Sequence, residues 1–144
     1  MLDELGLPAA LQLLARESGE AGAAQVDVQV EGAPVELPDE VKTALFRVSQ
    51  EGLANVAKHA GARTVRIELR FEAGGVGLRM SDDGRGFEVE RVQLDPQRGI
   101  GLRNMRERLA SIGGRFDVRA APGEGTLLDA WVPADALRRL AAPA

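Results

Sequence analysis

The chain has 144 residues and a formal net charge of −4, with 44% hydrophobic and 28% charged residues, which indicates one globular domain with its own core. The negative charge argues against nucleic acid as a partner, and the absence of cysteine excludes disulfides and thiolate metal sites. His59 is the only histidine, which excludes a three-histidine metal site. No apolar run of about 18 residues and no signal peptide are found, and we expect a soluble, cytoplasmic protein without membrane contact.

The first part of the chain predicts a helix, a strand and a longer helix. A short helix begins near Pro8, because proline fits a first helical turn, and residues 18–24 form a glycine-containing loop. Valine alternates with polar residues over 25–30, as in a half-buried strand. The longer helix spans about 38–60 and ends at Gly61, a residue that can cap it.

The second part predicts two hairpins separated by a helix, and a short helix in the tail. The expected elements are a strand at 64–71, a Gly-Gly turn at 74–75, a strand at 76–80, a helix at 99–112, strands at 115–120 and 126–132, and a fraying helix after Pro133. This order predicts an α/β (α+β) two-layer sandwich, with one mixed, mostly antiparallel sheet and about three helices on one face.

The longer helix carries a polar edge beside its apolar face. An acid, an amide, an amine and an imidazole lie there within an arc of roughly 100°: Glu51, Asn55, Lys58 and His59. A carboxylate can orient or deprotonate water or a hydroxyl, an amide oxygen suits Mg²⁺, and a lysine can meet a phosphate. The alternative is a solvated helix edge, with the histidine favoured by the helix dipole.

Two glycine-rich segments suggest where a ligand binds. Residues 82–87 follow a strand and place Gly84 and Gly86 directly after two acids, so that bare backbone lies open to a ligand. The helix at 99–112 begins between arginines and has no acid before Glu107, which favours an anion at its N-terminal N–H groups. An ordinary glycine-rich loop with solvated arginines is the alternative, and neither segment is a Walker loop or a dinucleotide fingerprint.

Four segments, in this order, resemble the ATP-binding boxes of the GHKL (Bergerat-fold) ATPases. They are Glu51–His59 (the N box), Asp82–Gly86 (Asp-x-Gly-x-Gly), Gly99–Leu102 (Gly-x-Gly-Leu) and Gly123–Thr126 (the last box). Within this superfamily, the Lys-His-Ala ending of the N box and the Met-Arg-Glu-Arg run at 105–108 resemble sensor histidine kinases that pair with LuxR/NarL-type response regulators. The resemblance covers nearly the whole chain.

The resemblance implies a division of the chain. Residues 1–24 would be the segment that follows a dimerisation hairpin, residues 25–133 the histidine-kinase-like ATPase domain, and residues 134–144 a C-terminal tail. The hairpin that carries the phosphoacceptor histidine is expected to lie outside this chain, so the domain alone would bind ATP but would not phosphorylate itself. We expect the isolated domain to be monomeric, whether or not its parent kinase is anchored in a membrane.

The resemblance also implies roles for single residues, with ATP and Mg²⁺ as cofactors. Asp82 would accept a hydrogen bond from the adenine amino group, Gly84 and Gly86 would let the base lie against the backbone, and Thr126 would complete the adenine end. The remaining roles are Asn55 as Mg²⁺ ligand, Lys58 and His59 near the phosphates, Glu51 as catalytic carboxylate, residues 88–98 as ATP lid, and Gly99, Gly101 and Leu102 as hinge and phosphate contact.

Two other functions fit part of the pattern. An anti-sigma-factor-type serine kinase is similarly short, but the Lys58-His59 pair and the Met-Arg-Glu-Arg run count against it. A non-catalytic nucleotide-binding scaffold is the other alternative, and the intact Asn55, Asp82 and glycine boxes speak against such degeneration. A protein-interaction domain without nucleotide would leave the polar helix edge unexplained.

Overall fold

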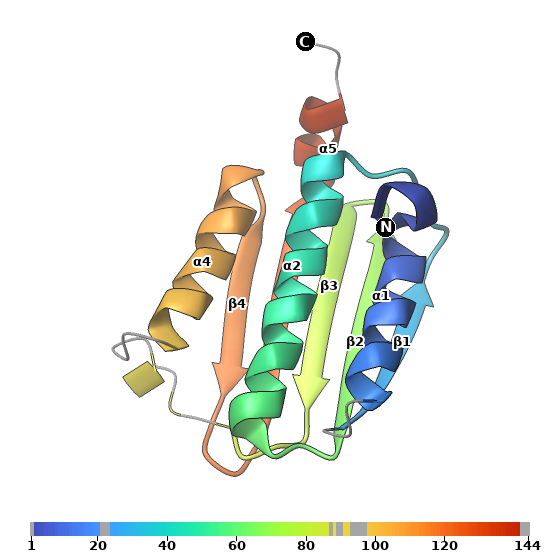
Figure 1. Cartoon of the computed structure of the whole chain (residues 1–144). Helices are drawn as coiled ribbons and strands as arrows, with labels where there is room; N and C mark the ends of the chain where they lie inside the picture. Colours follow the sequence, from blue (N-terminus) through green and yellow to red (C-terminus); the bar gives the residue numbers. More distant parts are fainter. Residues whose placement is uncertain (1, 21–23, 87, 89–90, 93–97, 142–144) are drawn as a thin grey trace.

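The computed structural model describes residues 2–20, 24–86, 88, 91–92 and 98–141 of the chain. Its elements are α1 (Leu2–Glu20), β1 (Gln25–Glu31), α2 (Asp39–Asn55), the π-helical turn η1 (Val56–Ala60), β2 (Thr64–Glu72), β3 (Gly75–Asp82), α4 (Arg98–Ser111), β4 (Arg115–Ala120), β5 (Thr126–Pro133) and α5 (Ala134–Ala141). Helices α1, α2 and α4 lie across one face of a single sheet, and α5 lies beyond its upper end (Figure 1). The predicted two-layer sandwich is confirmed.

The sheet has five strands in the order β1-β2-β3-β5-β4. Strands β1 and β2 are parallel, and every other neighbouring pair is antiparallel, which confirms the mixed, mostly antiparallel sheet and both predicted hairpins. The last residue of β3, Asp82, pairs with Val65 of β2 and with Thr126 of β5. Asp82 therefore lies at the end of an inner strand, with a neighbouring strand on each side.

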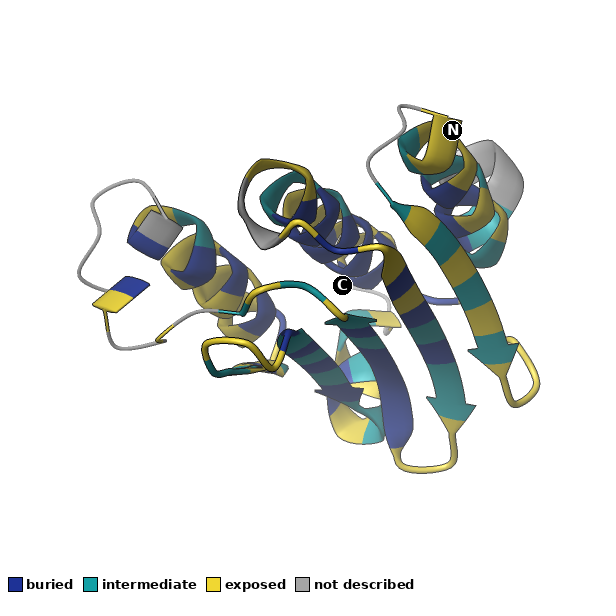
Figure 2. Ribbon diagram, turned by 90° about the horizontal axis from the view of Figure 1, so that it is seen from below, coloured by how far each residue is buried: buried dark blue, intermediate teal, exposed yellow. Residues whose placement is uncertain are grey.

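The core lies between the sheet and the three helices that cover it. Buried residues alternate with exposed or half-buried ones along β2 (Figure 2), because only one face of the strand meets the helices. The largest side chains with less than 2% exposure are Leu7, Leu11, Leu45, Ile67, Leu69, Leu78 and Leu109. With one tryptophan, four phenylalanines and no tyrosine in the chain, aliphatic side chains supply most of this core.

Helix α2 comes unusually close to the sheet at Gly52. A Cβ at this position would lie 2.6 Å from Met80 Sδ on β3 and 3.0 Å from Leu128 Cδ1 on β5. The glycine that lowers helix propensity therefore has a packing role, since no larger residue fits without a shift of these side chains.

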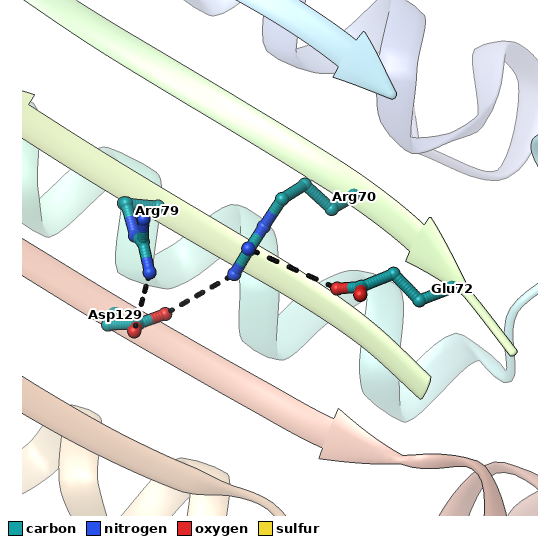
Figure 3. A network of polar contacts seen from close by, with 4 residues as sticks. All are labelled: Arg70, Glu72, Arg79 and Asp129. Carbon is teal, nitrogen blue, oxygen red and sulfur yellow. Dashed lines mark hydrogen bonds and ion pairs between the residues drawn. The ribbon is translucent and has the colours of Figure 1, made fainter. Parts of the chain in front are cut away.

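The other face of the sheet is polar and its charges compensate one another. Arg79 Nη2 lies 3.4 Å from Asp129 Oδ2, and Arg70 lies 4.0 Å from both Asp129 and Glu72 (Figure 3). These pairs link β2, β3 and β5 across the face that the three helices leave uncovered. Each pair is partly solvated and contributes little by itself.

The predicted end of the first helix was wrong, whereas its predicted start near Pro8 is confirmed for the main part of the helix. Helical structure begins at Leu2, but Gly6 is non-helical (φ 76°, ψ 167°), so the continuous helix starts directly after it. It continues to Glu20, through residues 18–20 that were expected in a loop. The buried Leu11 and Ala15 hold α1 in the core, and this packing outweighs the weak helix propensity of a late glycine.

The end of the second helix was predicted correctly in place but not in form. Gly61 adopts a left-handed conformation (φ 59°, ψ 27°) as expected of a capping glycine, but the last turn before it, η1, is π-helical. π-helical turns are rare and occur frequently at functional sites. In the tail, α5 confirms the expected short helix, and residues 142–144 lie outside the described part. No helix in the described part is long and apolar enough to cross a membrane.

Candidate functional site

Four elements meet at one end of the sandwich, the lower end in Figure 1. They are the C-terminal ends of α2 and β3 and the N-terminal ends of α4 and β5. Helix α2 and strand β3 run in the same direction, and Gly52 packs on Met80. One helical turn and two strand residues each advance the chain by about 6 Å, so the turn that holds Asn55 lies alongside Asp82. The N box and the first glycine box, predicted from distant segments, are thus neighbours.

Asp82 is half-buried and keeps spare acceptor capacity. Its Oδ1 accepts a hydrogen bond of 2.8 Å from the Gly84 N–H. Burial raises the pKa of the Asp82 carboxyl, while hydrogen bonds from the backbone of Gly84 and Thr126 offset part of that rise. A carboxylate accepts through two oxygens and about four lone-pair sites. Asp82 can therefore accept a further hydrogen bond from a ligand placed at this end of the sheet.

Asp83, the next residue, has its carboxylate engaged within the protein. Its Oδ1 accepts hydrogen bonds from the N–H groups of Arg63 (2.8 Å) and Thr64 (3.0 Å), and its Oδ2 accepts one from Thr64 Oγ1 (3.0 Å). These bonds, first of all that from the Thr64 backbone, lower the pKa of Asp83 below its ordinary value. The two adjacent acids are thus chemically distinct, and Asp82 is the one to which the family resemblance assigns the ligand contact.

The glycines after Asp82 bring the loop against the turn between β4 and β5. Gly86 has a φ of 66°, and a Cβ there would collide with the carbonyl oxygen of Ala121 and lie 2.8 Å from that of Gly125. Gly125 has a φ of 76°, and its Cβ would collide with the carbonyl oxygen of Asp82. Gly86 is therefore required by its positive φ and by the close approach of protein backbone, and a contact of this loop with a ligand stays a prediction.

The start of α4 lies against Glu51 of α2. A Cβ on Gly101 would be 2.8 Å from Glu51 Oε1, so a larger residue there would require the Glu51 side chain to shift. Helix α4 has no acidic residue in its first turn, and Glu51 supplies a carboxylate there from the neighbouring helix. Leu102 is only 3% exposed and belongs to the core, so it can contribute to a ligand site only through its main chain.

The structure describes some, but not all, of the other predicted site residues. The Lys58 side chain is exposed on η1, and Gly99 is buried in the first turn of α4. The side chain of His59 lies outside the described part, as do residues 89–90 and 93–97 of the predicted lid. In the described remainder of that segment, Val92 is 6% exposed and its N–H donates to the Glu88 carbonyl at 3.0 Å.

The donor set at this site bears on which cation it could hold. Within the described part of the chain, no three carboxylate or histidine side chains gather into a metal cage. Mg²⁺ is commonly bound through one or two protein oxygens together with waters and the phosphates of its substrate. The half-buried Asn55 therefore fits a cation that arrives with a nucleotide, and not one held by the protein alone.

Comparison with known proteins agrees with this geometry. Residues 40–136 match the model of the "Histidine kinase-, DNA gyrase B-, and HSP90-like ATPase" family. The chain belongs to this family and is an ATP-binding domain.

Its similarity within the family is to sensor histidine kinases. The chain is 36% identical over 138 residues to the sensor histidine kinase MctS of Rhizobium johnstonii, across 96% of the chain and 30% of MctS. It is 33% identical over 97 residues to the sensor protein VraS of Staphylococcus aureus, across 67% of the chain and 27% of VraS. The blue-light activated histidine kinase of Erythrobacter litoralis EL346 superposes with a TM-score of 0.70 at 26% identity, across 92% of the chain and 43% of that kinase.

The domain is therefore of the type that forms the catalytic ATPase domain of two-component sensor histidine kinases. It spans less than a third of the length of MctS and VraS.

Proposed function

We propose that this domain binds ATP together with Mg²⁺ and donates the γ-phosphoryl group to a histidine on a helical hairpin of its parent kinase. The observation that carries the proposal is the half-buried Asp82 carboxylate, which has spare acceptor capacity at the end of β3 and lies beside the turn that holds Asn55. An adenine amino group is a donor that such a carboxylate recognises, whereas the corresponding atom of guanine is an acceptor.

The other residues divide between the base and the phosphates. Thr126 pairs with Asp82 across β3 and β5 and closes the adenine end. The Asn55 oxygen would ligate Mg²⁺, with Lys58 and His59 near the phosphates and the start of α4, at Gly99 and Gly101, offering main-chain N–H groups to them. The cation, when bound, neutralises charge that develops on the transferred group.

Transfer requires positioning more than covalent chemistry on this domain. A ring nitrogen of the acceptor histidine would attack the γ-phosphorus, the bond to the β–γ bridging oxygen would break, and ADP would leave with the electron pair. Glu51 is the carboxylate at the start of α4, and we assign it the orientation of the acceptor imidazole through a hydrogen bond. The phosphoryl group would then pass to a LuxR/NarL-type response regulator, a partner that the resemblance suggests.

Calorimetric titration with ATP, with and without Mg²⁺, tests the proposal. We expect binding that strengthens with Mg²⁺, and a loss of about 1.5–3 kcal/mol for Asp82→Asn, because the amide cannot replace a charged acceptor. Asp27→Asn, on the exposed face of β1, is the matched control and should bind like the wild type. No binding at millimolar ATP would contradict the proposal.

A further inference from the structure

The residues of the Asp82–Gly86 loop divide into two sets. Asp82 keeps acceptor capacity for a ligand, whereas Asp83 and Arg85 engage residues 61–64, the connection between η1 and β2. This connection follows directly on the turn that carries Lys58. The first glycine box is therefore joined to the segment that follows the N box by protein contacts that neither motif predicts.

Asp83 makes the strongest of these contacts. Three donors from two consecutive residues, Arg63 and Thr64, meet its two carboxylate oxygens at 2.8–3.0 Å. The Asp83 N–H in turn donates to the Thr64 carbonyl at 3.4 Å, so main chain and side chain both hold this residue to the start of β2. Hydrogen bonds to a charged acceptor are stronger than those between neutral groups.

Arg85 and Gly86 hold the rest of the loop. The Arg85 Nε lies 3.4 Å from the point that a Cβ on Gly61 would occupy, so the guanidinium covers the glycine that caps η1. The Arg85 carbonyl accepts a hydrogen bond of 2.5 Å from the Gly123 N–H, in the β4–β5 turn. The loop is thus fixed on one side to the end of the N box and on the other to the last glycine box.

We infer that Asp83 is a positioning residue for adenine recognition, which fastens the loop to Arg63 and Thr64, shortly after the N box, and so fixes the Asp82 carboxylate relative to Asn55. This inference rests on the proposed function of the site. Asp83 itself touches no nucleotide, since its oxygens are engaged with Arg63 and Thr64.

Substitutions at Asp83 separate positioning from stability. An asparagine retains one oxygen for the two N–H groups, and its NH₂ can donate to Thr64 Oγ1, so Asp83→Asn should preserve the arrangement. An alanine removes all three acceptor contacts. The hydrogen bonds are exposed, so water can satisfy the freed donors, and Asp83→Ala should fold while its loop moves.

The test compares dissociation constants for ATP and GTP, measured by calorimetry on the wild type, Asp83→Ala, Asp83→Asn and the matched control Asp27→Ala. We expect Asp83→Ala to lose roughly tenfold in ATP affinity and most of the preference for ATP over GTP, because a small displacement of Asp82 spoils the contact with the base. Asp83→Asn should stay within about threefold of the wild type, and Asp27→Ala should match it.

Thermal unfolding followed by circular dichroism shows whether each variant folds. Should Asp83→Ala fail to fold, Thr64→Val removes only the exposed Oγ1 contact and should lower the ATP preference in the same direction by a smaller factor. The inference is overturned if the folded Asp83→Ala variant keeps the wild-type ratio of ATP to GTP dissociation constants. If Asp83→Ala does not fold, an unchanged ratio in Thr64→Val overturns it. An equal loss of ATP affinity in Asp83→Ala and Asp83→Asn overturns it as well. A wild type that does not bind ATP contradicts instead the proposed function.

Discussion

At the scale of single residues, Asp82 and Asp83 are adjacent carboxylates with opposite surroundings. Burial raises the pKa of one carboxyl, and hydrogen bonds lower the pKa of the other. Their difference follows from their surroundings, because Asp82 is half-buried whereas Asp83, directly after β3, accepts hydrogen bonds from Arg63 and Thr64. Asp82 is directed to the side of α2, and Asp83 to the start of β2.

The opposite pKa shifts predict how the stability of the domain depends on pH. The pKa of Asp83 is lowered in the folded state from an ordinary value of 3.8, so its stabilisation is present above that value and is lost as the pH falls through the lowered pKa. The raised pKa of Asp82 acts in the other direction, since its protonation in the folded state favours folding at low pH. Urea unfolding of Asp83→Asn between about pH 4 and 3 should therefore show a shallower loss of stability than the wild type. Equal slopes would mean that Asp83 keeps its ordinary pKa.

Asn55 allows a second prediction at this scale. Because its amide oxygen is the proposed protein ligand of Mg²⁺, Asn55→Ala should chiefly remove the difference between ATP affinity measured with Mg²⁺ and with EDTA. Affinity in EDTA should stay close to that of the wild type, because contacts with the base are intact. Gln50→Ala, on the same helix, is the control. An undiminished response to Mg²⁺ in Asn55→Ala would show that the cation is held elsewhere.

At the scale of elements, the approach of α2 to the sheet sets the distance between Asn55 and Asp82. We expect Gly52→Val to destabilise the domain by about 2 kcal/mol, because the added atoms meet Met80 and Leu128 in a filled core. The substitution Met80→Ala makes room for the added atoms. The double variant should therefore be about 1 kcal/mol more stable than the sum of the two single destabilisations predicts.

A double-mutant cycle from urea unfolding measures this coupling. In the control cycle, Val76→Ala replaces Met80→Ala. Val76 is buried on the same strand and is not among the atoms nearest to Gly52, so this cycle should show no coupling energy. Equal coupling energies in the two cycles would show that α2 is not limited by Met80.

Elements with local signals could be predicted from the sequence, and those shaped by packing could not. Gly74-Gly75 and the alternation on either side of it were sufficient for the β2–β3 hairpin. The π-helical form of η1 has no comparable signal, because the composition of residues 56–60 suits an α-helix equally. The extension of α1 to Glu20 is accompanied by contacts with α2 and β1, which local helix signals within residues 2–20 do not contain.

At the scale of the whole molecule, the motifs predicted which segments form the site but not how the protein holds them. The boxes were found by their order, and the fold brings their described residues to one end of the sandwich. The hydrogen bonds of Asp83 with residues 19 and 20 positions away, and the contact of Gly101 with Glu51, arise only when distant elements pack. Spacing within a motif carries no information on such partners.

The last prediction concerns phosphoryl transfer from ATP bound by this domain to the proposed acceptor hairpin. His59, the only histidine of this sequence, lies within the N box, and we expect the acceptor histidine on a hairpin outside it. Incubated alone with radiolabelled ATP and Mg²⁺, the domain should therefore remain unlabelled. Addition of a hairpin from the parent kinase should give phosphate on the hairpin that is lost in acid and kept in alkali, as expected of phosphohistidine.

Two variants make the transfer experiment specific. Asp82→Asn should slow the labelling by weakening ATP binding, while a hairpin with its acceptor histidine replaced by glutamine should take up no label. Acid-stable phosphate on a protein serine would instead support a serine kinase of the anti-sigma-factor type. ATP binding without transfer to an intact hairpin would support a nucleotide-binding scaffold. The proposed recognition of the base by Asp82 needs no acceptor, whereas transfer would require the acceptor imidazole to reach the γ-phosphorus.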